Sequence, residues 1–288
     1  MSDKPEASPA ACSSPECCRL GEHGRVQSEY DEAINLIRSV RAATSHLGPE
    51  RGRYWSLPAS RISADFYCTA VHPKFGWFCL LADAAGHGLA SAVFALHTPM
   101  LFRESVLRGM SLAAIHERIH HFLLRLQLSS YYVCGILMRI QGREIEVINA
   151  GMPDALLMAA DGRLSEAFPS RYLPFGIDMG SDRHGKEGKN NKWNKKDSAG
   201  REANRPVPQR YRLARDESAS MLLYSDGLSE QGILTGAAFG RDGVLATAVS
   251  GADQVFDRLL ERIAENTATL HDDVSMALIP VPFGEPPQ

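Results

Sequence analysis

The stretch FCLLADAAGHGLASAVFAL, residues 78–96, joins an apolar run to a helical pattern through a turn that holds one carboxylate and two glycines. The apolar run that leads to Asp83 has the composition of a buried strand. A charge at the end of such a strand is costly to bury unless something neutralises it. Gly86 and Gly88 keep the turn free of side chains, so that backbone can come close to a ligand. The stretch therefore predicts a ligand site at Asp83.

Strand and helix patterns on both sides of this turn predict the fold. DFYCTAV and GWFCLLAD, separated by HPKFG, are typical of a β-hairpin. Two amphipathic helical patterns follow, one from Gly88 that buries Val93 and breaks at Pro99, and one over residues 112–126. YYVCGILMRI, EIEVINA and DALLMAA then predict an antiparallel meander, followed by a strand, a helix near residues 255–263 and a last strand. This order favours an α+β sandwich over a doubly wound sheet.

Length and composition indicate an ordinary globular chain. Its 288 residues are 44% hydrophobic and 23% charged, with a formal net charge of -3. This charge argues against a dedicated binder of nucleic acid or anionic membranes, which would carry a basic surplus. No apolar run reaches the roughly 20 residues of a membrane span, and the polar N-terminus lacks a signal-peptide core. We therefore expect a cytoplasmic protein that binds neither nucleic acid nor membrane.

The sequence divides into a tail, a helix and one large domain. Residues 1–26 are rich in Ser, Pro, Cys and Glu without an apolar period, which predicts a mobile tail. Residues 27–48 predict an amphipathic helix for docking or dimerisation, with Leu36 on its apolar face. Residues 50–283 form the main domain, in which a basic, Lys- and Asn-rich segment at about 178–209 predicts a flexible insertion.

Aspartates recur at the edges of apolar strands, in SADFYC, CLLAD, LLYSD and DDVSMALI. Any one of them alone is explained by an ordinary turn, where Asp before Gly is common. A set of carboxylates without His or Cys suits hard ions such as Mg²⁺ and Mn²⁺. Two such ions bridged by a carboxylate would form a phosphatase centre. The residues of this set are Asp65, Asp83, Asp226, Asp272 and Asp273.

Motifs around these aspartates resemble one protein family. In order they are ADFYC, LLADAAGHGLASAVF, NAGMPDALLMAADGRL, LPFGI, LLYSDGLSE, FGRDGV and DDVSMALI, and they cover about residues 57–281 apart from the insertion. The series resembles the SpoIIE-type branch of the metal-dependent, type 2C-like (PPM) protein serine/threonine phosphatases. The resemblance implies a central antiparallel β-sandwich flanked by helices and two Mn²⁺ or Mg²⁺ ions. It also implies hydrolysis of phosphoserine or phosphothreonine by metal-bound hydroxide, on a STAS-type anti-sigma-factor antagonist.

The resemblance assigns a role to most of the aspartates. Asp83 matches the carboxylate that bridges both metals, with the backbone carbonyl of Ala84 beside it. Asp65 matches a ligand of one metal, while Asp226 and Asp272 match ligands of the other. Asp83 and Asp65 are accordingly the expected catalytic carboxylates.

Three further residues have alternative explanations. Asp273 is the less favoured metal ligand of the Asp272-Asp273 pair. Arg61 lies four residues before Asp65, the spacing of the phosphate-binding arginine in the eukaryotic type 2C enzymes, and Arg suits phosphate; a surface arginine is the simpler explanation. His87 could donate a proton to the leaving oxygen, although a capping or packing role is favoured.

Two clusters of zinc-type ligands have simpler explanations than a metal site. The spacing in the tail fits no standard zinc motif, and the histidines downstream fit a polar helix face. The residues are Cys12, Cys17, Cys18 and His23 in the tail, and His116, His120 and His121 on the helix.

The sequence departs from the family pattern at three places. Ser63-Ala64 stands before Asp65 where the family has Gly-Gly, Cys68 stands where an acidic residue is common, and Met152 stands where His is usual. These changes thin the polar surroundings of the site, and they keep open a pseudophosphatase that binds its partner without hydrolysis. A phosphatase of small metabolites is a third reading. Because the chain has no room for a receiver, PAS or GAF sensor before the domain, we expect the signal to come from an upstream sensor protein, from the helix over residues 27–47 or from the tail. A homodimer is a further expectation.

Overall fold

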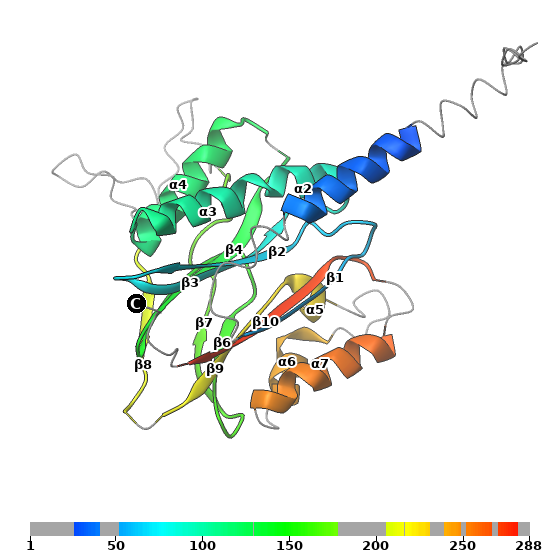
Figure 1. Ribbon diagram of the computed structural model, residues 1–288. Helices are drawn as coiled ribbons and strands as arrows, with labels where there is room; N and C mark the ends of the chain where they lie inside the picture. Colours follow the sequence, from blue (N-terminus) through cyan, green and yellow to red (C-terminus); the bar gives the residue numbers. More distant parts are fainter. Residues whose placement is uncertain are drawn as a thin grey trace, which may run out of the picture.

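Two antiparallel five-stranded sheets face each other in the computed structural model, and helices cover the outer face of each sheet (Figure 1). The structure describes residues 26–40, 52–128, 130–177, 206–215, 217–230, 239–248, 252–266 and 270–281. The predicted α+β fold, a β-sandwich flanked by helices, is therefore confirmed. The tail, residues 41–48 and most of the basic insertion lie outside the described residues.

The two sheets draw their strands from both halves of the chain. The first sheet has the order β1 (Arg53–Leu57), β10 (Val274–Val281), β9 (Ala219–Tyr224), β6 (Ala155–Ala159) and β7 (Leu164–Phe168). The second has the order β2 (Phe66–His72), β3 (Gly76–Ala84), β4 (Val133–Gln141), β5 (Glu144–Ala150) and β8 (Gln209–Arg212). The helices are α2 (Leu89–Ala95), α3 (His97–Leu107), α4 (Leu112–Arg125), α5 (Asp226–Ser229), α6 (Gly240–Ala248), α7 (Ala252–Asn266) and a helix over residues 26–40.

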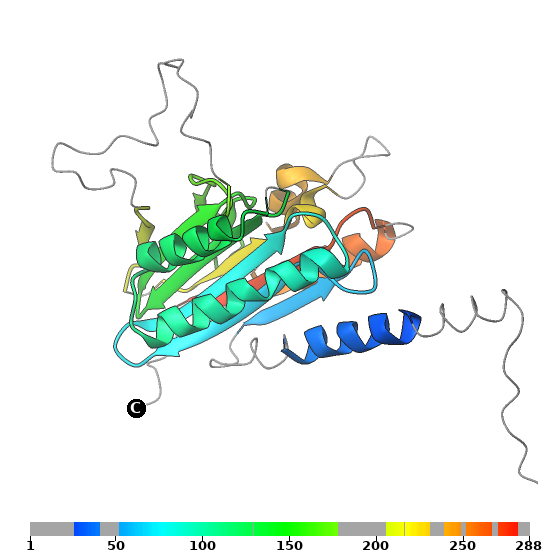
Figure 2. The same cartoon turned by 90° about the horizontal axis from the view of Figure 1, so that it is seen from above.

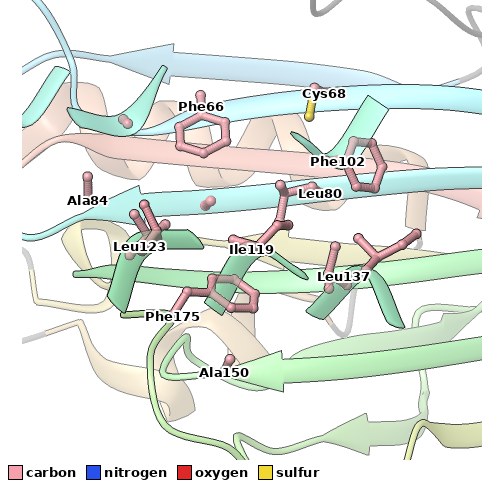
Figure 3. Close-up of a cluster of buried hydrophobic side chains, with 14 of the residues drawn as sticks. Phe66, Cys68, Leu80, Ala84, Phe102, Ile119, Leu123, Leu137, Ala150 and Phe175 are labelled. Carbon is pink, nitrogen blue, oxygen red and sulfur yellow. The ribbon is translucent and has the colours of Figure 1, made fainter. Parts of the chain in front are cut away.

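Burial on both faces explains why the strands are continuous apolar runs. Successive residues of a strand point to opposite faces, so Leu80 packs under the helices while Leu81 packs between the sheets. The helix-covered layer also holds Phe102 of α3 and Ile119 of α4 (Figure 3). A third layer, between the first sheet and α6 and α7, completes the order of helix, sheet, sheet, helix.

The helical segment after Gly88 differs from its predicted face. It breaks at Leu96, between α2 and α3, close to the break expected from Pro99. Val93, however, is 47% exposed, whereas Ser91, Ala92 and Ala95 are buried. Small side chains allow α2 to approach β3 closely, and this turns the larger Val93 toward solvent.

β6 does not continue the predicted meander. β4 and β5 pair as expected, but β6 pairs with β7 and β9 in the opposite sheet. The chain crosses over at a sharp turn, where the Asn149 side chain donates to the Pro153 carbonyl oxygen at 2.8 Å and accepts from the Met152 N–H at 3.0 Å. Gly151 has φ 88° in this turn, a conformation that favours glycine.

The helix over residues 26–40 docks on the domain through a rotated face. Ile34 and Ile37 are 2% and 4% exposed and pack with Ile62 and Ala92, whereas Leu36 is 66% exposed, contrary to the predicted face. The helix is drawn in blue in Figures 1 and 2. Dimerisation through this helix stays a prediction. None of the described helices combines the length and apolar character needed to cross a membrane.

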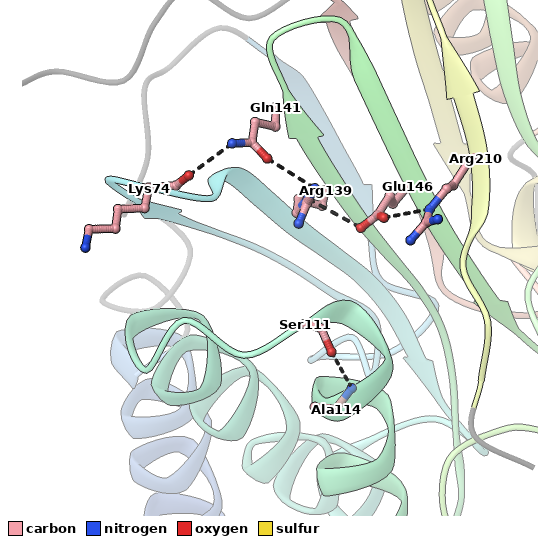
Figure 4. Close-up of polar contacts among 7 residues, drawn as sticks. All are labelled: Lys74, Ser111, Ala114, Arg139, Gln141, Glu146 and Arg210. Atoms are coloured by element: carbon pink, nitrogen blue, oxygen red, sulfur yellow. Dashed lines mark hydrogen bonds and ion pairs between the residues drawn. The ribbon is translucent and has the colours of Figure 1, made fainter.

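Ion pairs fasten the open edge of the second sheet, at the end of β4 remote from Asp83. Glu146 accepts from Arg210 at 2.9 Å and pairs with Arg139 at 3.4 Å (Figure 4). In the same view, Ser111 Oγ caps α4 by accepting the Ala114 N–H at 3.3 Å. The ion pairs thus join β4, β5 and β8, and the Ser111 cap stabilises the start of α4.

Candidate active site

The β2-β3 hairpin brings Asp65 and Asp83 together. Phe66 pairs with Ala82 in the hairpin register, so Asp65 and Asp83 each lie one residue beyond that pair. Asp65 is 2% exposed. Two acidic residues 18 positions apart in the sequence thus become neighbours at one end of the second sheet.

The first sheet supplies the other aspartates. Asp226 begins α5 directly after β9, and Asp272 and Asp273 precede β10, which pairs with β9. Gly227 is required by close approach, because a Cβ atom there would lie 2.0 Å from the Asp273 carbonyl oxygen. The Asp-Gly pair therefore lets the turn that carries Asp226 lie directly on the start of β10.

Burial and electrostatic effects within the group raise the pKa values of three of these carboxylates. Burial, reinforced by the charges of Asp65, Asp226 and Asp272, raises the pKa of Asp83 to about 10. Burial also raises the pKa of Asp65 to about 8, an effect partly offset by hydrogen bonding from Ser275 and Ser225. The pKa of Asp272 is raised as well, first by burial. A cation placed among these groups would relieve the cost of their charge.

The donor chemistry fits a hard divalent cation. Every carboxylate of the cluster offers oxygen, the ligand that Mg²⁺ and Mn²⁺ prefer. Asp226 Oδ1 is buried without a hydrogen-bond partner in the described part of the chain, which is costly for a polar atom unless it has a ligand. Within the described ranges, no three His, Cys, Asp or Glu side chains already converge on one point as metal ligands.

Asp273 is engaged by backbone instead. Its Oδ1 accepts the Ala59 N–H at 2.7 Å and its Oδ2 accepts the Ala64 N–H at 2.5 Å. The side chain is 2% exposed. The two members of the pair therefore differ, since Asp272 is only half-buried and accepts one hydrogen bond, from the Asp273 N–H at 2.8 Å.

Arg61 points to the N-terminal helix. Its guanidinium pairs with Asp31 at 2.5 Å and lies over the Tyr30 ring, 5.4 Å from the centroid. The pair is about half-exposed, and exposed pairs contribute little to stability. A phosphate-binding role for Arg61 stays a prediction, and it would require the guanidinium to leave Asp31.

The turn after Asp83 has the expected backbone. Gly86 and Gly88 have φ of 79° and 86°, in the region that favours glycine. Ala84 is the last residue of β3, fully buried and paired with Val133; its carbonyl as a metal ligand stays a prediction. His87 is exposed, and its charge lowers the pKa of Asp272, opposing the larger effect of burial.

The family departures are accommodated by packing. Cys68 lies in the helix-covered core and Met152 between the sheets, at 2% and 4% exposure, so neither faces the carboxylates as a polar group. Ser63 Oγ accepts the Asp65 N–H at 3.0 Å.

The expectation of a polar helix face at His116 is wrong, because this ring is 8% exposed and its centroid lies 5.0 Å from that of the Phe175 ring.

Three polar residues near the cluster have no counterpart in the sequence-based prediction. Cys134 is the register partner of Asp83, and its pKa rises to about 12 through burial and the charges of the aspartates. Ser225 and Ser275 are fully buried and hydrogen-bonded, with the Ser275 N–H donating to Ser225 Oγ at 2.9 Å. Their positions beside acidic residues in YSD and DDVS were the available signal.

Comparisons with known proteins agree with this architecture. The family model described as Stage II sporulation protein E (SpoIIE) matches residues 73–282. No curated protein sequence matches the chain significantly.

Solved structures with the same fold are distant in sequence. The SiaA-PP2C domain of Pseudomonas aeruginosa has a TM-score of 0.66 at 16% identity, covering 90% of this chain and 98% of that one. The PP2C phosphatase domain of SpoIIE from Bacillus subtilis, with a fragment of its regulatory domain, has a TM-score of 0.57 at 14% identity, and the match covers 82% of this chain and 63% of that one. RsbX in complex with magnesium has a TM-score of 0.51 at 11% identity, and the match covers 79% of this chain and 92% of that one.

Proposed function

Since this chain belongs to the SpoIIE family of PP2C-type protein serine/threonine phosphatases, we propose that it is an active enzyme with two Mn²⁺ or Mg²⁺ ions. The proposed reaction is hydrolysis of phosphoserine or phosphothreonine on a cytoplasmic partner protein. The observation that carries the proposal is that aspartates from both sheets lie at one end of the sandwich, where burial and the charges of Asp65, Asp226 and Asp272 raise the pKa of Asp83. A magnesium complex of RsbX, which shares the fold, supports this choice of cation.

The chain's own residues would divide the work as follows. The charges of Asp65, Asp226 and Asp272 act on Asp83, which would hold both ions. Asp65 would hold one of the ions, and Asp226 and Asp272 would hold the other. Bound divalent cations supply an activated water and neutralise the charge that develops on phosphate. The open turn at Gly86 and Gly88 would admit the phosphorylated side chain, because no Cβ atom blocks it.

The partner is proposed from the structural neighbours and from the family. Solved relatives include the RsbU and RsbW domains of a Mycobacterium tuberculosis protein, and RsbX. We propose a STAS-type anti-sigma-factor antagonist as the phosphorylated substrate, with an upstream protein acting on the helix over residues 26–40.

The test is release of phosphate by the purified protein. With Mn²⁺, wild type should hydrolyse p-nitrophenyl phosphate and a phosphoserine protein, and Asp83→Asn should abolish both. Full activity in this variant would refute the assignment. The alternative, a pseudophosphatase favoured by Cys68 and Met152, predicts partner binding without Mn²⁺ binding in calorimetry. A metabolite phosphatase would prefer small phosphate esters over the phosphoprotein.

A further inference from the structure

We infer that Asp273 is a positioning residue, which fixes the loop before β2 so that Asp65 enters the carboxylate cluster, while Asp272 is the member of the pair left to hold a cation. The inference rests on the proposed metal-dependent function and deepens it, because it separates two adjacent aspartates that the sequence leaves equivalent.

The contacts of Asp273 tie the two sheets together. Ala59 and Ala64 lie at the two ends of a loop that leads from β1 in the first sheet to β2 in the second. Both donate their N–H groups to one carboxylate, at 2.7 Å and 2.5 Å. Hydrogen bonds to an ionised acceptor are among the stronger ones in proteins. Asp273 therefore sets the path of this loop into Asp65.

Further hydrogen bonds complete the placement of Asp65. Ser63 Oγ accepts the Asp65 N–H at 3.0 Å, and the hydroxyls of Ser225, which follows β9, and of Ser275 in β10 hydrogen-bond the Asp65 carboxylate. Ser275 Oγ also forms a hydrogen bond with Ser56 Oγ of β1, 2.9 Å away. Asp65 is thus held by groups from the first sheet although it precedes a strand of the second.

Asp272 has the opposite character. It is half-buried, and among the described residues one of its oxygens accepts a backbone hydrogen bond, from the Asp273 N–H. The charge of Asp272 contributes to the raised pKa of Asp83, after burial and the charges of Asp65 and Asp226. Asp273 is buried and both of its oxygens are oriented by the N–H groups of the loop, so it could not turn toward a cation without breaking those hydrogen bonds, whereas half-buried Asp272 can turn an oxygen to a cation and leave the loop in place.

The experiment compares Asp273→Asn with its matched control, Asp272→Asn. Two quantities are measured: hydrogen exchange at the Ala59 and Ala64 amides, and Mn²⁺ affinity by calorimetry. An amide side chain keeps only one acceptor oxygen, so Asp273→Asn should speed exchange at one or both amides. It should also weaken Mn²⁺ binding by about 10- to 100-fold, as loss of a supporting group around metal ligands does.

The control should separate the two roles. Asp272→Asn should weaken Mn²⁺ binding while exchange at Ala59 and Ala64 stays at the wild-type rate. Wild-type Mn²⁺ affinity in folded Asp273→Asn, or in Asp273→Ser if the first variant does not fold, would overturn the inference alone. Absence of Mn²⁺ binding by the wild-type protein would overturn the proposed function, and the inference with it.

Discussion

The buried ring of His116 leads to a quantitative prediction about stability and pH. His116 lies on α4, packs against Phe175 and Tyr172, and has His120 as a stacked neighbour with centroids 6.0 Å apart. Burial, and then the charges of His120 and His121, lowers its pKa from 6.5 to about 3. Neither ring nitrogen has a hydrogen-bond partner in the described residues. The folded protein therefore keeps this ring neutral.

The sign follows from proton uptake. Below pH 6.5 the unfolded chain protonates His116 and the folded chain does not, so stability falls as pH drops from about 6.5 toward 3. Within this window the free energy of unfolding falls by about 1.4 kcal/mol for each pH unit, because the unfolded chain binds one more proton than the folded chain. Between pH 7.5 and pH 5.0 the contribution of His116 to the loss is about 2 kcal/mol.

Urea unfolding of wild type and His116→Phe at the two pH values isolates this contribution. Phenylalanine fits an aromatic site and cannot titrate, so wild type should lose about 2 kcal/mol more than the variant between pH 7.5 and pH 5.0. As a control, Ile115→Ala on the same helix should lower stability about equally at both values, because it opens a cavity. The same pH dependence in wild type and His116→Phe would refute the reasoning.

Three further predictions concern other parts of the chain. Asp83→Asn should raise the melting temperature of the metal-free protein at neutral pH, measured by calorimetry, because the raised pKa of Asp83 obliges this side chain to take up a proton on folding, a cost that asparagine avoids; a lower value would contradict the charge cluster. Ile37→Ala should release the docked helix, seen as faster proteolysis there, whereas the exposed Leu36→Ala should not; equal rates would show that the docking face is wrong. Gly151→Ala should lower the free energy of unfolding by about 2–4 kcal/mol in urea, because Gly151 has φ 88° and an added Cβ would lie 2.6 Å from the Pro174 ring. Gly142→Ala, which also has a positive φ but open space around it, should lower it by about 1–2 kcal/mol. Similar losses in the two variants would contradict the crowding argument.

Local sequence patterns predicted that the aspartates lie at strand ends. Asp83 and Asp226 each end a short apolar run and precede a glycine-containing turn, and the short length and flanking glycines of such a run favour a buried strand whichever neighbours it has. The hairpin that joins Asp65 to Asp83 also followed from a short turn between two strands. These features depend on residues near one another in the sequence.

The features that could not be predicted depend on distant partners. Nothing within DALLMAA shows that β6 joins the opposite sheet, since its pattern suits either one. Helical spacing placed Val93 inside because it could not show that α2 approaches β3 through alanine and serine. Asp272 and Asp273 look equivalent in the sequence, and only the loop from Ala59 to Ala64 distinguishes them.

The central claim is that aspartates from the two sheets share divalent cations. Anomalous diffraction from crystals grown with Mn²⁺ tests it most directly. We expect two Mn²⁺ peaks, with Asp83 between them and Asp65, Asp226 and Asp272 as further ligands. Saturating Mn²⁺ that leaves no peak among these carboxylates would contradict the claim.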